Sequence, residues 1–335
     1  MSASNRTDQL RAAVRQRLGV EVQLREPLQP LAGGYSNEIF RFSLDGASPP
    51  FDEPLVLRIT HDALDTAREV TIEDGVAQEG FPASPVLLHG DASSPFCTPF
   101  IITPLAPGVA FDDTITARTA IASFRRLPEQ LAATMASLHE VPTERIRVRL
   151  TTGGWPPDRL DSLAVLADVD GYAEQIQSPD LKRQTALLRE RQPSFGEPVV
   201  CHGDLHPFNL LYGAGQVTAV LDWELGRLAD PAFDVGRTLV LLRQAPYPMS
   251  RATRTAIQPV ATWLARRFEQ AYRARRPLEE ASVRWHEALH CLRTFAIAEV
   301  GATLPPGDRL RRTADVWLPC RPRLQRRFVQ LTSGW

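Results

Sequence analysis

The chain has 335 residues, of which 43% are hydrophobic, and its formal net charge at pH 7 is −1. This length allows two lobes or two small domains, and a charge near zero gives no global field that would favour nucleic acid or a membrane surface. No apolar run reaches the roughly 18 residues that a membrane-spanning helix needs. The four cysteines are scattered and the amino terminus lacks the apolar core of a signal peptide, so we expect a cytoplasmic protein with reduced thiols.

The composition also limits how the chain can hold phosphates. Lys182 is the only lysine, so the Gly-Lys-Ser/Thr of a Walker A loop cannot occur. If a strand near the amino terminus supplies a cation to nucleotide phosphates, that cation must be arginine.

The amino-terminal part of the sequence has the pattern of a sheet with one helix. A glycine turn that contains Gly33, Gly34 and Ser36 lies between two expected strands, at residues 28–32 and 37–44. Such a turn can lay backbone N–H groups over phosphates, but an ordinary turn has the same sequence. A five-stranded antiparallel sheet is completed by strands at 54–59, 86–88 and 100–103, with a helix at 62–79.

The pattern becomes helical in the second part of the chain. From residue 120 onward apolar residues recur at helical spacing, and residues 250–332 give three helical segments. Arginine-rich segments near the carboxyl terminus alternate with apolar residues, which is typical of solvated helix faces and not of a nucleic-acid surface.

A segment that ends at Asp222 carries the strongest functional signal. It contains His202-x-Asp204-x4-Asn209, the spacing of a kinase catalytic loop, and Asp222 ends the next apolar run, where a kinase places a metal-holding aspartate. Two short strands joined by the turn at 213–215 predict that Asn209 and Asp222 lie side by side. Phosphoryl transfer needs one carboxylate to accept an alcohol proton, and an amide and a second carboxylate to hold Mg²⁺. Asp204 is therefore the predicted base, and Asn209 and Asp222 are the predicted metal ligands.

Three sequence blocks make a resemblance specific: HGDLHPFNLL from His202, VLDWE from Val220 and DPAFD from Asp230. They resemble the aminoglycoside phosphotransferase and choline-kinase-like family, which has a protein-kinase-like fold. The resemblance implies an α+β fold with two lobes, a nucleotide-binding lobe built on an antiparallel sheet at residues 1–103 and a mainly helical lobe at 104–335 with the catalytic loop and the acceptor site. It also implies Mg²⁺-dependent transfer of the γ-phosphate of ATP or GTP to a hydroxyl of a small molecule, such as an aminoglycoside-like antibiotic, an amino sugar or a related metabolite.

The resemblance assigns roles in the expected nucleotide site. Arg58, on the strand at 54–59, takes the place of the lysine that contacts phosphates in a kinase. Glu69 matches the helix glutamate that pairs with this cation, and Glu73, one helical turn later, competes with it. The glycine turn would lie over the phosphates.

The break after residue 103 corresponds to the hinge between the lobes. Adenine would bind there to backbone groups near Thr103, and because Pro104 has no N–H to donate, the donor is expected from a neighbour such as Leu105. Two further family positions are interpreted as structural: His139 as a hydrogen-bonded histidine, and Asp234 as an aspartate that braces the catalytic loop.

Two other functions remain as alternatives. His202, Asp204, His206 and Asp222 could be ligands of a metal-dependent phosphohydrolase, but the Asn-His dipeptide that such enzymes need is absent. If His202 is not a metal ligand, we expect it to be scaffolding, a residue that packs against the loop and forms hydrogen bonds with it. The second alternative is a catalytically inactive kinase fold that only binds its ligand, although the predicted base, metal ligands and phosphate cation are all present.

Of the features of the expected site, the identity of the acceptor is the one that the sequence specifies least. In this family the carboxy-terminal helices line the acceptor pocket, and Glu299 lies on the apolar stripe of the helical segment 285–304. A carboxylate in that position either pairs internally, with Arg293 or another arginine, or faces the cleft, where it would bind a cationic acceptor.

Overall fold

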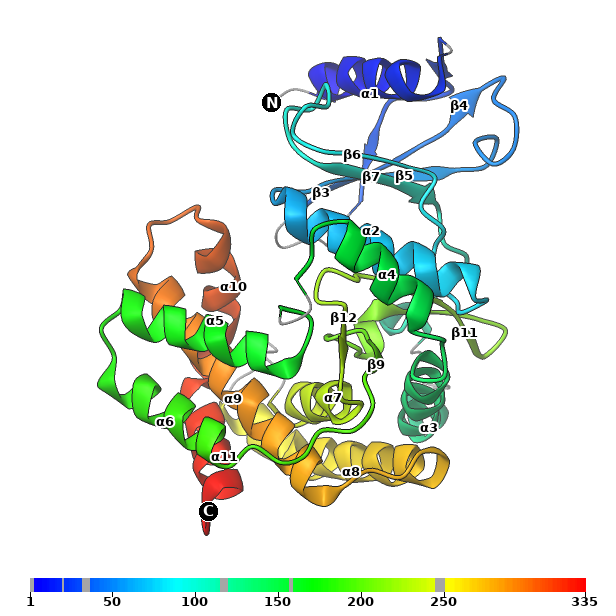
Figure 1. Cartoon of the computed structure of the whole chain (residues 1–335). Helices are drawn as coiled ribbons and strands as arrows, with labels where there is room; N and C mark the ends of the chain where they lie inside the picture. The colour runs from blue at the N-terminus through cyan, green and yellow to red at the C-terminus, as the bar shows by residue number, and fades with distance from the viewer. Residues whose placement is uncertain (1–2, 20, 32–36, 115–119, 157–158, 245–250) are drawn as a thin grey trace.

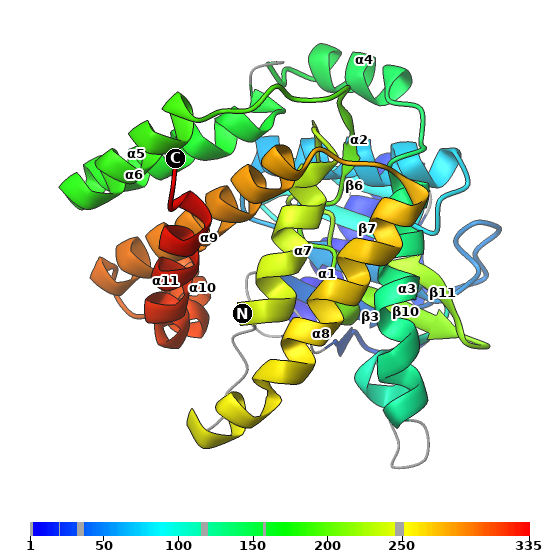
Figure 2. The ribbon, with the colours of Figure 1, turned by 90° about the horizontal axis from the view of Figure 1, so that it is seen from below.

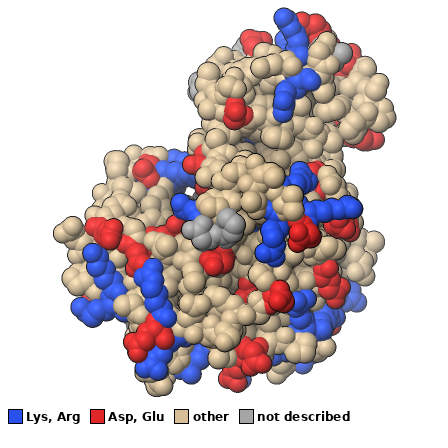
Figure 3. All heavy atoms as spheres, viewed as in Figure 1, with Lys and Arg blue, Asp and Glu red and all other residues tan. Residues whose placement is uncertain are grey.

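The computed structural model describes residues 3–19, 21–31, 37–114, 120–156, 159–244 and 251–335. Within these ranges a part built on an antiparallel sheet is followed by a mainly helical part (Figure 1). This arrangement confirms the predicted α+β fold class. A narrow waist lies between the two parts in the space-filling view, and acidic and basic side chains are interspersed over the face shown, without a large area of one sign (Figure 3).

The described residues form the expected five-stranded sheet, in which every neighbouring pair is antiparallel. The spatial order is β2-β3-β5-β7-β6, and the strands are β2 (Gln29–Pro30), β3 (Glu38–Phe42), β5 (Leu55–Ile59), β7 (Phe100–Pro104) and β6 (Leu88–Gly90). A second, two-stranded pair joins β1 (Gln23–Leu24) to β4 (Leu44–Asp45). The sheet matches the prediction in strand number and direction, but β2 is shorter than the predicted 28–32 and β6 is shifted by two residues from the predicted 86–88.

The alternation along β5 decides which way Arg58 points. Leu55, Leu57 and Ile59 are fully buried in a cluster shared with helix α1 (Ala3–Leu18), which covers that face of the sheet (Figure 1). Because successive side chains of a strand point to opposite faces, Arg58 lies on the other face. Helix α2 (Ala63–Gln78) packs there, and its first turn is capped by the Asp62 carboxylate, which accepts the Asp65 N–H at 2.8 Å.

Helices dominate the rest of the described chain. They are α3 (Ala120–Leu138), α4 (Glu144–Thr152), α5 (Ser162–Gln175), α6 (Pro179–Glu190), α7 (Ala232–Gln244), α8 (Arg251–Arg275), α9 (Glu280–Thr303), α10 (Arg309–Trp317) and α11 (Arg321–Thr332). Helix α3 packs against α8, and α7 lies between α8 and α9 (Figure 2). Gly236 lets α7 approach α9 closely, because an added Cβ would lie 2.7 Å from the Glu287 nitrogen.

The prediction of three helices between residues 250 and 332 was wrong by one. The described residues of this region form four α-helices, since the short 3₁₀ turn η4 (Leu318–Cys320) separates α10 from α11. This turn contains Pro319, which lacks the N–H that a continuous helix would use. Within the described ranges, every helix is too short or too polar to cross a bilayer.

Short strands carry the predicted catalytic segment. They are β9 (Val199–Cys201), paired with β12 (Arg227–Ala229), and the hairpin of β10 (Leu210–Gly213) and β11 (Gln216–Val220), whose first strand also pairs with β8 (Val109–Ala110). The short 3₁₀ helices are η1 (Asp112–Thr114) and η3 (Pro207–Asn209).

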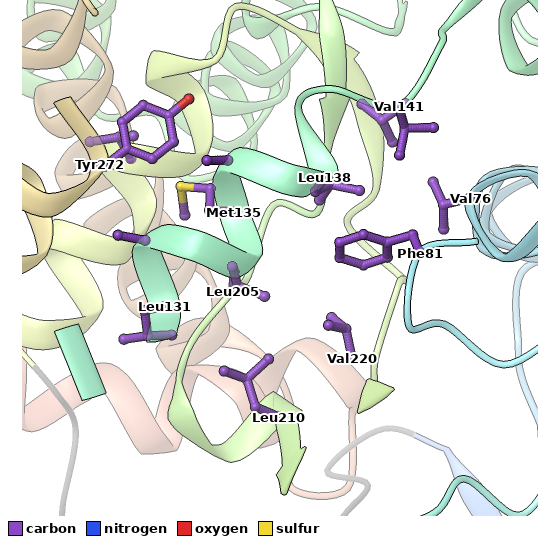
Figure 4. Close-up of a cluster of buried hydrophobic side chains, with 14 of the residues drawn as sticks. Val76, Phe81, Leu131, Met135, Leu138, Val141, Leu205, Leu210, Val220 and Tyr272 are labelled. Atoms are coloured by element: carbon purple, nitrogen blue, oxygen red, sulfur yellow. The ribbon is translucent and has the colours of Figure 1, made fainter. Parts of the chain in front are cut away.

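One hydrophobic cluster fixes this segment against both parts of the fold (Figure 4). Val76 and Phe81, from α2 and the turn after it, meet Leu138 of α3 and Leu205 and Val220 of the catalytic segment. Burial of one such side chain stabilises the fold by about 1.5–3 kcal/mol. The catalytic segment and helix α2, below the sheet, therefore pack into the same hydrophobic cluster.

Candidate active site

Helix α7 holds the backbone of the catalytic loop. The Asp234 carboxylate accepts the His202 N–H at 2.8 Å and the Gly203 N–H at 2.6 Å, and the Thr238 hydroxyl donates to the Leu205 carbonyl at 2.7 Å. Gly203 has φ +80°, and a Cβ there would lie 2.4 Å from the Leu225 carbonyl oxygen, so only glycine fits. These contacts confirm the bracing role predicted for Asp234.

His202 is scaffolding, as the sequence predicted. It is fully buried, its Nε2 lies 3.0 Å from the Leu221 carbonyl oxygen, and its Nδ1 accepts the Asp204 N–H at 3.2 Å. Burial lowers the pKa of His202, although Asp234 and Asp204 oppose this effect. A neutral ring with its proton on Nε2 satisfies both contacts, which leaves neither nitrogen for a metal ion.

His139 is likewise structural. Its Nε2 lies 3.2 Å from the Asp234 carboxylate and its Nδ1 lies 2.6 Å from the Tyr272 hydroxyl. Among the described residues, His139, Cys201 and Asp234 are the one group close enough to suit a metal ion. Burial raises the pKa of the Cys201 thiol well above its ordinary value, and Asp234 is already occupied by two backbone N–H groups. This group is a hydrogen-bonded brace.

Asp204 follows this scaffold in a half-buried position and pairs with an arginine that the sequence did not reveal. The Arg237 guanidinium donates to Asp204 Oδ1 from Nη2 at 2.7 Å and from Nε at 2.9 Å, and His206 Nε2 lies 3.5 Å from Oδ2. Burial alone would raise the pKa of Asp204, but Arg237 and His206 lower it far below its ordinary value. Arg237 follows Asp234 by three residues, so helical spacing alone places both on the face toward the loop.

The β10–β11 hairpin pairs the backbone of Asn209 with Leu221, the residue before Asp222, which is the backbone arrangement that the prediction requires. Leu210 pairs with Val220, and the Leu221 N–H donates to the Asn209 carbonyl at 2.8 Å. The Asn209 amide nitrogen donates to the Asp204 carbonyl at 3.0 Å, which leaves the amide oxygen directed elsewhere. Asp222 is exposed and has φ +67°, a backbone conformation that aspartate and asparagine tolerate better than most residues.

On the opposite side, both candidate glutamates of α2 contact Arg58. Arg58 Nη2 lies 2.5 Å from a Glu69 carboxylate oxygen and 3.6 Å from a Glu73 carboxylate oxygen. Burial raises the pKa of Glu69, and it raises the pKa of Glu73 to about 8, although Arg58 opposes both effects. Asp222 raises the pKa of both glutamates too, so its charge acts on the Arg58 cluster.

The raised pKa of Glu73 predicts how stability depends on pH. Between its ordinary value of 4.5 and about 8, the folded protein holds a proton that the unfolded chain has released. The contribution is therefore complete below pH 4.5 and is lost as the pH rises through 8, by up to about 1.4 kcal/mol per pH unit. We expect the melting temperature of the nucleotide-free protein to fall more steeply between pH 5 and 8 than that of Glu73→Gln, and this difference in slope to disappear above pH 8. An unchanged slope in Glu73→Gln, with exposed Glu144→Gln as the control, would contradict a buried proton on Glu73.

A family model described as the phosphotransferase enzyme family matches residues 27–278, more than half of the chain. The chain belongs to the phosphotransferase enzyme family. The resemblance inferred from the catalytic segment is thereby confirmed.

Two curated relatives match parts of this chain. Acyl-CoA dehydrogenase family member 10 from Mus musculus is 25% identical over 249 residues, which cover 69% of this chain and 23% of the relative. An aminoglycoside 3'-phosphotransferase from Escherichia coli is 30% identical over 103 residues, 30% of this chain and 38% of the relative. The chain therefore spans less than half the length of either relative.

Solved aminoglycoside phosphotransferases share the fold of this family member. APH(4)-Ia superposes with a TM-score of 0.64 at 15% identity, covering 100% of both chains. A thermostable mutant of that protein, in a ternary complex with AMP-PNP and hygromycin B, gives 0.62 at 15% identity, over 98% of this chain and 100% of the other. A complex of APH(2'')-IIIa with GDP and kanamycin gives a TM-score of 0.57 at 15% identity, and the superposition covers 93% of this chain and 97% of the other.

The segment predicted as a hinge differs from the sequence prediction at Leu105. Thr103 is paired with Val56 in the sheet, and the Leu105 N–H donates to the Pro54 carbonyl at 2.8 Å. That N–H is therefore occupied and is not available to an adenine, which corrects the predicted donor. The sequence could not show this, because it depends on the register between β5 and β7. Gly33, Gly34 and Ser36 lie outside the described residues.

Glu299 has an internal partner, the alternative that the sequence had left open. Its carboxylate forms an ion pair with Arg321 of α11, and not with Arg293. The side chain is 25% exposed, so this is a surface pair of small energetic weight. Because Glu299 is paired with Arg321, its carboxylate no longer gives a reason to expect a cationic group on the acceptor.

Proposed function

We propose that the protein is an Mg²⁺-dependent phosphotransferase that moves the γ-phosphate of ATP or GTP to a hydroxyl group of a small molecule. The observation that carries this proposal is the catalytic loop itself. Asp234 fixes its backbone, and the Asn209 side chain at the start of the β10–β11 hairpin binds the backbone carbonyl of Asp204. Family membership and the shared fold support the same chemistry.

The residues fit a magnesium ion. Mg²⁺ prefers oxygen ligands, and Asn209 has its amide nitrogen bound to the Asp204 carbonyl, so that the amide oxygen is the atom left for a metal. Asp222 has neither a hydrogen bond nor an ion pair with any described residue. Asn209 and Asp222 would hold the ion, which would neutralise charge on the nucleotide phosphates when bound.

Asp204 would position the acceptor hydroxyl. The oxygen of that hydroxyl forms the new bond to the γ-phosphorus, the bond to the β–γ bridging oxygen breaks, and the hydroxyl proton passes to Asp204 or to water. Because Arg237 and His206 keep the pKa of Asp204 low, the carboxylate is ionised at neutral pH and accepts a hydrogen bond from the hydroxyl. Such a weak base takes the proton late in the transfer, when the oxygen has already become acidic.

The nucleotide site would extend from Arg58 to the hinge. Arg58 can chelate phosphate oxygens while Glu69 holds it in place. Since successive N–H groups of an extended chain point in opposite directions, the next donor after Leu105 that points away from β5 is Ala106, just beyond β7, which we propose in its place. Gly33, Gly34 and Ser36 remain proposed phosphate contacts, with the lobe boundary between residues 103 and 104.

Replacement of Arg58 tests this site. Arg58→Lys keeps the charge beside Glu69 and Glu73 but loses the planar fork, so we expect a nucleotide KM raised about tenfold and partial activity. Arg58→Ala should lower kcat further, and it should also lower the melting temperature, because it leaves two buried carboxylates without their cation. Steady-state kinetics with varied nucleotide measure both. An Arg58→Ala protein with wild-type KM and kcat would remove this strand from the nucleotide site.

The direct test of the proposed function is a screen for nucleotide consumption with Mg²⁺ across hydroxyl-bearing small molecules of different charge. Aminoglycosides, macrolides, amino sugars, neutral sugars, sugar phosphates and hydroxy acids form the panel. We expect ATP or GTP to be consumed with at least one class, and the product to gain the mass of one phosphoryl group. Tight nucleotide binding without consumption across the panel would favour the inactive kinase fold.

A further inference from the structure

Two arginines outside the predicted site lie beside the catalytic loop. Arg227, the first residue of β12, pairs across the strands with Cys201, which immediately precedes the loop. Its guanidinium lies over the Phe233 ring, 4.8 Å from the centroid. Helix α9 reaches the same ring, since His290 Nε2 contacts the Phe233 carbonyl at 3.0 Å and the two rings are 4.5 Å apart. Arg293 follows His290 by three residues and so lies one helical turn further along α9, on the same side.

Arg293 is also close to the reactive carboxylate. Its neighbour Thr294 accepts a hydrogen bond from Arg237 Nη1 at 3.1 Å, and the same guanidinium binds Asp204 through its other nitrogens. The positive charge of Arg237 is a major influence on Arg293, second only to burial in lowering its pKa. Strand β12 and helices α7 and α9 thus bring Arg227, Arg237 and Arg293 together at the Asp204 side of the site.

Only one of these three arginines has a carboxylate partner. Arg237 pairs with Asp204, whereas within the described part of the chain the buried Arg227 donates only to the carbonyls of Leu225 at 3.4 Å and Asp161 at 3.3 Å. Among the described residues, nothing forms a hydrogen bond or an ion pair with the Arg293 guanidinium.

The surroundings do not offset this excess of positive charge. Burial and the nearby charges of Arg68 and Arg293 lower the pKa of Arg227 to about 9. Asp168 of α5 acts on both Arg227 and Arg293, but it lies 3.7 Å from Arg159 instead. Crowded like charges that are taken out of water are costly unless an anion pairs with them.

We propose that Arg227 and Arg293 bind an anionic group of the acceptor, a carboxylate or a phosphate that it carries besides the hydroxyl that receives the γ-phosphate. The inference rests on the proposed function and narrows its substrate class. The hydroxyl would lie at Asp204, and the anion would lie on the far side of Arg237. It also reverses the charge that Glu299 had suggested for the acceptor, since Glu299 is paired with Arg321.

Anion binding to the nucleotide-loaded protein tests this inference. The protein is saturated with Mg²⁺ and a non-hydrolysable ATP analogue, so that the phosphate contacts of the nucleotide are occupied, and is titrated with inorganic phosphate, acetate or chloride at equal ionic strength. We expect phosphate or acetate to raise the melting temperature of the wild type more than chloride does. A larger effect of phosphate indicates a phosphate-bearing acceptor, and a larger effect of acetate indicates a carboxylate.

Arg293→Gln is the decisive variant, because Arg293 has no hydrogen bond or ion pair within the described residues that folding would lose, and glutamine keeps much of its packing. In this variant we expect the anion concentration that gives half of the maximal stabilisation to rise about 10-fold to 100-fold, because one charge-assisted hydrogen-bonding group is lost. Arg227→Gln is measured in parallel and should show a rise in the same direction. Arg266→Gln, an exposed arginine of α8, is the matched control and should behave as wild type.

Two results would overturn the anion site: no stabilisation beyond that of chloride in the wild type, or an equal effect in wild type and Arg293→Gln. The proposed function fails separately, through absence of Mg²⁺-dependent nucleotide binding in the wild type. An anion effect that is seen without nucleotide and lost in Arg293→Gln would then keep the anion site while rejecting the phosphotransferase.

Discussion

Asp204→Asn should lower kcat by about 10²–10⁴ while nucleotide affinity changes little. The amide keeps the size of the side chain but removes the negative charge that would accept the hydroxyl proton. Steady-state kinetics with a saturating acceptor, together with calorimetric titration of the nucleotide, separate the two quantities. Because the pKa of Asp204 lies far below neutrality, the wild-type rate should also show no loss from protonation of this group between pH 6 and 8.

Asp204→Asn also weakens the ion pair with Arg237, so its melting temperature must be measured alongside. Asp180→Asn, on the exposed first turn of α6, is the control and should keep wild-type kinetics. Full transfer activity in a folded Asp204→Asn protein would remove this residue from the role of base.

Loss of Asp222 should abolish the Mg²⁺ dependence of nucleotide binding. Asp222→Asn is the sharper variant, since asparagine tolerates the positive φ of +67° whereas alanine adds backbone strain. Asn209→Ala should weaken binding less, and it should also lower kcat because it removes the hydrogen bond to the Asp204 carbonyl. Calorimetric titration of ATP with and without Mg²⁺ measures both variants.

An equal gain in nucleotide affinity from Mg²⁺ in wild type and Asp222→Asn would contradict the assignment. Tight Zn²⁺ binding that depends on His202 and His206 would instead support the phosphohydrolase. The geometry argues against that outcome, because both ring nitrogens of His202 already have partners within the loop.

The sequence predicted those features that depend on local pattern. Alternation and turn residues were enough for the five strands, and spacing alone brought Asn209 and Asp222 to one hairpin. The brace at Asp234 was also predicted, through the family resemblance. Glu69 was predicted to pair with Arg58 and Glu73 to compete with it, and only the structure shows that Arg58 contacts the two together.

The features that the sequence missed depend on contacts between distant elements. The use of the Leu105 N–H by Pro54 depends on the register of two strands, which an apolar pattern does not specify. The pairing of Glu299 with Arg321 joins α9 to α11, and many arginines in the chain were equally suitable by type. Arg237 was the one omission with a usable signal, its i+3 spacing from Asp234.

The central claim is tested most directly by following the γ-phosphate. The wild type and Asp204→Asn are incubated with Mg²⁺ and γ-labelled ATP in the presence of an acceptor that promotes nucleotide consumption. The account predicts that the label appears in a phosphorylated acceptor in the wild type, and that this product falls about 10²–10⁴-fold in Asp204→Asn. Label found only in inorganic phosphate, at the same rate with and without the acceptor, would contradict it.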